Sequence, residues 1–174
     1  LVDRSTLVAI GGIAAIRDQL IDDCALGKAM KARGPVWLGL AEDVVSLRGY
    51  PRWADVWMLI ARSAFTQLGF SSAMLVVTVL SMTATYVLAP VLALLGDGPA
   101  RTIAVAAVLM MVFAYQPTLR YYRLPPTVAL ALPAIAVFYT AATVDSARRH
   151  WLGRGGAWKG RFQAQQQERA LNES

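Results

Sequence analysis

The sequence predicts an integral membrane protein with an amphipathic N-terminal third, about three apolar membrane segments and a basic C-terminal tail. Apolar residues make up 56% of the 174 residues, and charged residues only 16%. The two kinds are also segregated, because Asp97, Arg101, Arg120 and Arg123 are the only charged residues between positions 69 and 144. A soluble core cannot bury so long an apolar stretch, whereas a bilayer can.

The positive charge of the chain is concentrated at its C-terminal end. Net charge is +6, and the residues from Arg148 onward hold 6 Lys or Arg against 2 Glu. A basic segment beside an apolar one usually lies among anionic lipid headgroups on the cytoplasmic side. The tail lacks the length and interleaved aromatic residues of a nucleic-acid-binding module, so no nucleic-acid partner is expected. A single cysteine and a single histidine argue against a disulfide and against a Cys/His zinc site.

The first 52 residues alternate short periodic segments with glycine and proline breaks. Ser5 or Thr6 can cap a short helix that runs to Ile10 and ends at the Gly11-Gly12 pair. Residues 13–20 read as helix or turn. A clearer helix is expected over residues 24–32, after an acidic pair and before Gly34-Pro35, and two short strands over 36–40 and 44–47.

Residues 53–68 have the periodicity of an amphipathic helix. The apolar stripe consists of six residues at helical spacing: Trp53, Val56, Trp57, Ile60, Ala64 and Leu68. Two tryptophans on the apolar side suit a helix that lies in the membrane interface. The alternative is a helix packed on a soluble core, but its direct continuation into a membrane segment favours the interface.

The membrane region covers residues 69–146 and contains apolar segments at 70–95, 103–119 and 127–144, followed by the tail, residues 147–174. Pro90 falls near the end of the first segment and Pro133 inside the third. With residues 1–68 cytoplasmic, three full crossings would leave the most basic part of the chain outside. We therefore expect the third segment to dip in and return or to lie shallow, although its length also permits a full span.

Asp22 and Asp23 are the residues of greatest chemical interest in the N-terminal third. Acidic residues at the start of a helix cap free N–H groups and interact favourably with the helix dipole, which is their commonest role. A carboxylate can also act as the general base that deprotonates an acceptor hydroxyl. Spacing alone does not decide between the two roles.

A wider set of motifs resembles the family 2 glycosyltransferases, most closely the hopene-associated branch and more distantly the ceramide glucosyltransferase type. The resemblance begins with the arginine-bearing start of the chain, the Gly11-Gly12 turn and the acidic pair. It continues through Ser46-Leu47-Arg48-Gly49-Tyr50-Pro51, through Ala61 to Leu68, and through Gly153 to Arg161. It spans almost the whole chain.

The resemblance implies a fold and a set of site residues. Residues 1–52 would be the C-terminal part of a cytosolic, mixed α/β (GT-A-like) catalytic domain. The catalytic base of the family falls on Asp23, with Asp22 supporting it. The substrate-binding positions would be Gly11, Gly12, Arg62, Trp158, Lys159 and Arg161. Arg62 also suits a snorkelling interfacial arginine, and the tail group a general lipid contact.

The same resemblance implies an inverting, multi-pass enzyme of the cell (inner) membrane, with a cytoplasmic catalytic part, a nucleotide-sugar donor and a lipid acceptor. The Asp-x-Asp motif that holds a divalent metal (Mg or Mn) in the family does not occur in this sequence. We therefore expect the metal ligands and the donor-binding half to lie upstream of Leu1, and this chain alone to be inactive. The alternative is a non-catalytic membrane anchor or lipid-handling module.

Overall fold

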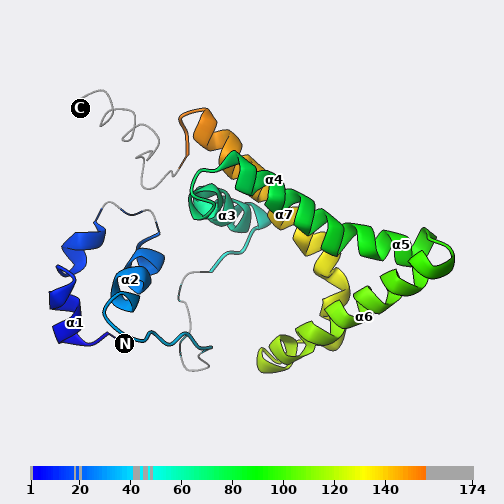
Figure 1. Cartoon of the computed structure of the whole chain (residues 1–174), viewed down its shortest axis with the longest axis horizontal. Helices are drawn as coiled ribbons and strands as arrows, with labels where there is room; N and C mark the ends of the chain where they lie inside the picture. Colours follow the sequence, from blue (N-terminus) through cyan, green and yellow to red (C-terminus); the bar gives the residue numbers. More distant parts are fainter. Residues whose placement is uncertain are drawn as a thin grey trace.

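A computed structural model describes residues 2–17, 19, 21–40, 44, 47 and 49–155, and all regular structure among them is helical. The expected mixed α/β character is therefore not seen in this part of the chain. Two parts can be distinguished in Figure 1, the short N-terminal helices α1 and α2 and the long helices α3 to α7.

The N-terminal part begins with α1 (Arg4–Ala9), the short turn η1 (Ile13–Ile16) and α2 (Asp22–Lys31). The N-cap of α1 is Asp3 rather than the expected Ser5 or Thr6, because a carboxylate oxygen of Asp3 accepts the N–H of Thr6 at 2.9 Å. Hydrogen bonds from Ser5 and Thr6 hold the pKa of Asp3 below its ordinary value. The expected break after α1 is confirmed, since Gly11 and Gly12 have φ of 92° and 70°, conformations that favour glycine.

The strand expected over residues 36–40 is wrong. This segment has no regular structure, and Trp37 and Leu38 are 85% and 96% exposed. A strand needs a neighbouring strand to pair with its backbone groups, and no described segment offers one. Half of the second expected strand, over 44–47, lies outside the described residues.

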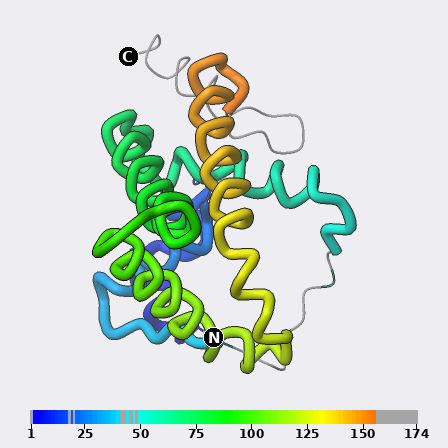
Figure 2. Tube along the Cα trace, turned by 90° about the vertical axis from the view of Figure 1, so that its right-hand side faces the viewer, coloured from blue at the N-terminus to red at the C-terminus, as the bar shows by residue number. Residues whose placement is uncertain are grey.

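Helix α3 (Trp53–Gln67) matches the expected amphipathic helix closely. At its start, Asp55 accepts hydrogen bonds from the backbone and the side chain of Arg52, which secures the first turn. Figure 1 shows α3 nearly end-on beside α4 and α7, whereas Figure 2 shows it along its length. Contacts between α3 and α7 extend from the ring of Trp53, beside Phe138, to that of Phe65, beside Trp151.

Three continuous helical stretches are long and apolar enough to cross a membrane: Ser72–Leu95, Gly98–Tyr121 and Pro126–Trp151. The first two contain 24 residues each, or about 36 Å at 1.5 Å per residue, which exceeds a hydrocarbon core of about 30 Å. Many of their large apolar side chains point outward, including Leu80, Ile103 and Phe113 at 64%, 70% and 79% exposure. Such surfaces require lipid around them.

The first stretch consists of α4 (Ser72–Thr83), a π-helical turn η2 (Ala84–Leu88) and α5 (Ala89–Leu95). Pro90 stands at the start of α5. Proline has no N–H for the preceding turn, so the hydrogen-bond pattern changes there without ending the helix. Gly96 and Asp97 then reverse the chain into α6 (Gly98–Tyr121), which packs back along α5.

The third stretch begins with a 3-10 segment, η3 (Pro126–Ala131), and continues as α7 (Leu132–Trp151). Two small cores hold it in place. At one end of α7, Ala147 shares a core with Phe65 of α3 and Leu75 of α4. At the other end, Leu132 packs with Leu119 of α6 and Ala129 of η3. Helix α7 therefore packs against α3, α4 and α6.

Candidate functional site

The acidic pair begins helix α2, as expected. Asp22 and Asp23 form its first turn, and both are exposed. A carboxylate oxygen of Asp22 accepts the N–H of Asp23 at 3.0 Å, and one of Asp23 accepts the N–H of Cys24 at 2.8 Å. Each carboxylate thus keeps one oxygen outside these bonds, directed to a surface that a substrate can reach.

The other expected site residues are not gathered around this pair. Gly11 and Gly12 form the turn after α1, whereas Arg62 lies half-buried in the middle of α3, with its Nε atom buried. Figure 1 shows α2 beside α1, in a different helix group from α3. Trp158, Lys159 and Arg161 lie outside the described residues.

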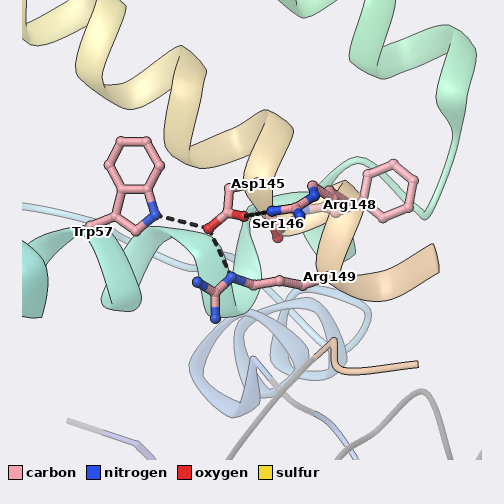
Figure 3. A network of polar contacts seen from close by, with 6 residues as sticks. Trp57, Asp145, Ser146, Arg148 and Arg149 are labelled. Atoms are coloured by element: carbon pink, nitrogen blue, oxygen red, sulfur yellow. Dashed lines mark hydrogen bonds and ion pairs between the residues drawn. The ribbon is translucent and has the colours of Figure 1, made fainter. Parts of the chain in front are cut away.

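A polar network joins α3 to α7 (Figure 3). A carboxylate oxygen of Asp145 accepts the indole N–H of Trp57 at 2.9 Å and the Nε–H of Arg149 at 2.7 Å. Arg148 lies 3.9 Å from the other oxygen. The Asp145 side chain is 16% exposed, and such a partly buried carboxylate requires these partners.

An aromatic cluster lies next to this network. Phe65 is 1% exposed, and its ring centroid lies 5.4 Å from that of His150 and 5.7 Å from that of Trp151. His150 also stacks on Phe70, with ring centroids 4.5 Å apart. The buried Ser146 hydroxyl accepts the backbone N–H of Phe65 at 3.1 Å. This end of α7 is thus fixed against both α3 and the start of α4.

Sequence reasoning missed the α7 half of this junction. On α3, the expected stripe included Ile60, which is buried, but it also included Ala64 and Leu68 and left out Ala61 and Phe65, which are the other buried residues. Asp145 follows directly on the expected end of the third apolar segment, and the helix continues to Trp151. A lone acidic residue there, four positions before Arg149, was the available signal for a polar contact between helices.

A groove of about 220 Å³ runs between the first and third apolar helices. One wall comes from α4 and η2, and the other from α7; the lining residues are Met82, Thr83, Val87, Ala136, Val137, Thr140 and Ala141. The lining is mainly apolar, with two threonines. Both walls belong to apolar helices.

The described residues do not fit a metal site. No group of three or more His, Cys, Asp or Glu side chains among them is close enough together to hold a metal ion. Asp22 and Asp23 are only a pair, and no third ligand lies near them in the described part of the chain.

Outward-facing apolar helices define a multi-pass membrane protein. Within that class, the model of Glycosyl transferase family 21 matches residues 1–166, and the chain belongs to this family. The family is the ceramide glucosyltransferase-like type, which the sequence motifs indicated as the more distant of the two resemblances. No match was found among the curated proteins or among the solved structures.

We expect the Trp57–Asp145 bond to couple α3 to α7. Trp57→Phe keeps an aromatic ring beside Phe138, whose centroid lies 5.2 Å away, but removes the N–H donor. In a double-mutant cycle with Asp145→Ala, the coupling should be about 1–3 kcal/mol, as for a hydrogen bond to a charged group. The free energies of unfolding in detergent measure this coupling.

Trp53→Phe is the matched control, since Trp53 also contacts Phe138 (5.9 Å) but is 79% exposed. Additive effects of Trp57→Phe and Asp145→Ala would contradict the coupling.

Proposed function

We propose that this chain is part of a membrane-bound, inverting glycosyltransferase that transfers a sugar from a nucleotide-sugar donor to the hydroxyl of a lipid. The observation that carries the proposal is the family match over residues 1–166 in a chain with three long apolar helices. Donor and catalytic chemistry take place on the cytoplasmic side, where nucleotide sugars are found.

Asp23 is the general base in this proposal. Its carboxylate takes the proton of the acceptor hydroxyl while that oxygen attacks the anomeric carbon of the donor. The bond from the anomeric carbon to the nucleoside diphosphate breaks in the same step, and the diphosphate leaves with the bonding electrons, which inverts the configuration. The exposed position of Asp23 at the start of α2 supports the role, because a substrate can approach the carboxylate.

The membrane helices position the acceptor. The hydrocarbon part of an acceptor lipid lies among the apolar helices. Its hydroxyl lies near the interface, beside α3. The groove between α4 and α7 is mainly apolar, which supports a lipid acceptor. Holding both substrates in one geometry supplies much of the rate gain of a two-substrate enzyme.

Three finer points rest on the motifs and on the family. A hopanoid-related acceptor follows from the motifs shared with the hopene-associated branch. The divalent ion implied by the resemblance would have its ligands outside the described residues, which offer no such site. In the tail, Trp158, Lys159 and Arg161 would contact a diphosphate or lipid phosphate, as Arg62 would from α3.

Transfer by the intact protein tests the proposal. Membranes that contain the full-length protein are supplied with radiolabelled nucleotide sugars and a lipid extract, and label is followed into the organic phase. We expect label in one lipid product, and release of nucleoside diphosphate in equal amount. A protein that binds lipid but transfers no sugar from any donor would instead support the non-catalytic membrane module.

A further inference from the structure

We infer that the third apolar helix does not cross the membrane, but enters it and returns to the face on which α3 lies. The inference concerns the stretch Pro126–Trp151, which is long and apolar enough to span. It depends on where the two ends of this stretch lie relative to the first apolar helix. It is independent of the proposed activity.

The C-terminal end of α7 lies at the start of the first apolar helix. The His150 ring stacks on Phe70, which precedes α4 by two residues, with ring centroids 4.5 Å apart. Ala147, fully buried, shares a core with Leu75 in the first turn of α4 and with Phe65 of α3. The end of α7, the start of α4 and helix α3 therefore lie at one surface of the membrane.

The number of crossings, odd or even, decides on which side of the membrane the end of α7 lies. Figure 1 shows α4 and α5 leading away from α3, and α6 leading back from the Gly96–Asp97 turn. Those two passes turn the chain back toward the side of α3. A third full crossing would place the end of α7 about 30 Å from that side, on the opposite surface. The contact between His150 and Phe70 is incompatible with that separation.

The start of α7 lies in the middle of the bilayer. Leu132, its first residue, belongs to a core that also contacts Tyr86. Tyr86 lies in η2, near the middle of the first apolar stretch, Ser72–Leu95. Leu119, two positions before the end of α6, belongs to the same core, so η3 joins α6 to α7 beside Tyr86.

Prolines and packing make this entry feasible. Pro125, Pro126 and Pro133 lack N–H groups, so fewer backbone donors need a partner where the chain turns. Ala129 is fully buried and Leu119 nearly so, and η3 packs on α6. Irregular backbone at membrane depth is tolerated where it is buried in protein in this way.

The consequence is a basic, aromatic rim on the face of α3. Arg148 and Arg154, both exposed, leave the bilayer there with Arg149. Trp151, at 60% exposure, lies beside Phe65 at the same end of α7 and suits the headgroup region. The described part of the chain thus ends, at Gly155, on the side of α3, which agrees with the positive-inside bias.

Cysteine labelling in sealed vesicles of both orientations tests the topology. In a Cys24→Ala background, single variants Lys31→Cys, Asp97→Cys, Tyr122→Cys and Arg154→Cys replace residues that are all exposed. A membrane-impermeant maleimide should label Arg154→Cys and Tyr122→Cys from the same face as Lys31→Cys, and Asp97→Cys from the other.

The pair Tyr122→Cys and Arg154→Cys is decisive, because these positions flank the third apolar stretch. If the two label from opposite faces, the stretch crosses and the inference is wrong. Labelling of Arg154→Cys only after detergent is added would also contradict it, since this exposed position should be reachable from one face. Full labelling of every variant in detergent confirms that the thiols are present and reactive.

Discussion

Asp23→Asn in the full-length enzyme should lower kcat by a factor of about 10²–10⁴, the usual contribution of a general base. The amide matches the carboxylate in size and still accepts the N–H of Cys24, which Asp23 accepts at 2.8 Å. It cannot take the proton of an acceptor hydroxyl. Helix α2 and donor binding should therefore be unchanged while turnover is lost. Steady-state sugar transfer and donor affinity measure the two effects separately.

Asp22→Asn is the matched control for that experiment. Asp22 occupies the same exposed turn and accepts the N–H of Asp23 at 3.0 Å, so a capping defect should be similar in both variants. We expect the loss of turnover to be much smaller for Asp22→Asn. Near-normal turnover by a folded Asp23→Asn enzyme, or equal losses in both variants, would leave capping as the role of the pair.

Phe65→Ala should lower the free energy of unfolding by about 3–5 kcal/mol, the usual cost of removing a buried aromatic ring. Phe65 is 1% exposed and contacts three other rings, those of Phe70, His150 and Trp151. Its removal leaves a cavity where α3, α4 and α7 meet. We also expect α3 to become sensitive to protease, because this core joins it to the membrane helices. Thermal unfolding in detergent provides the free energies.

Phe113→Ala is the matched control, because it makes the same substitution at an exposed phenylalanine. Phe113 lies on α6 with 79% of its surface exposed, facing the lipid or detergent. Its loss should change stability by a small fraction of the Phe65→Ala effect, and leave α3 resistant to protease. If the two variants were equally destabilised, the α3–α7 core would not have the importance that the packing indicates.

The helical elements could largely be predicted because each depends on local pattern. The amphipathic periodicity of residues 53–68 corresponds to α3, and three apolar runs correspond to the three long helices. The Gly11-Gly12 break follows from backbone sterics alone. For the acidic pair, local capping rules predicted a helix start, and α2 begins at Asp22.

Long-range pairing could not be predicted from the same patterns. A strand at 36–40 depends on a partner that periodicity does not reveal, and there the expectation was wrong. Asp145 and Trp57 are 88 positions apart, so their bond reflects how α3 packs on α7 rather than any local motif. The acidic pair and Arg62 were predicted as site residues from motif likeness, which carries no distance between them. Their roles remain predictions.

The junction between α3 and α7 also constrains the order of assembly during synthesis. Helix α3 leaves the ribosome long before its partner, because the hydrogen bond from Phe65 to Ser146 joins residues 81 positions apart. Until α7 has been made and inserted, the buried face of α3, formed by Ile60, Ala61 and Phe65, has no α7 to cover it. Chains arrested before residue 132 should therefore expose this face to chaperones or lipid. Helix α3 is fully anchored only when α7 has packed against it, so assembly finishes near the end of translation.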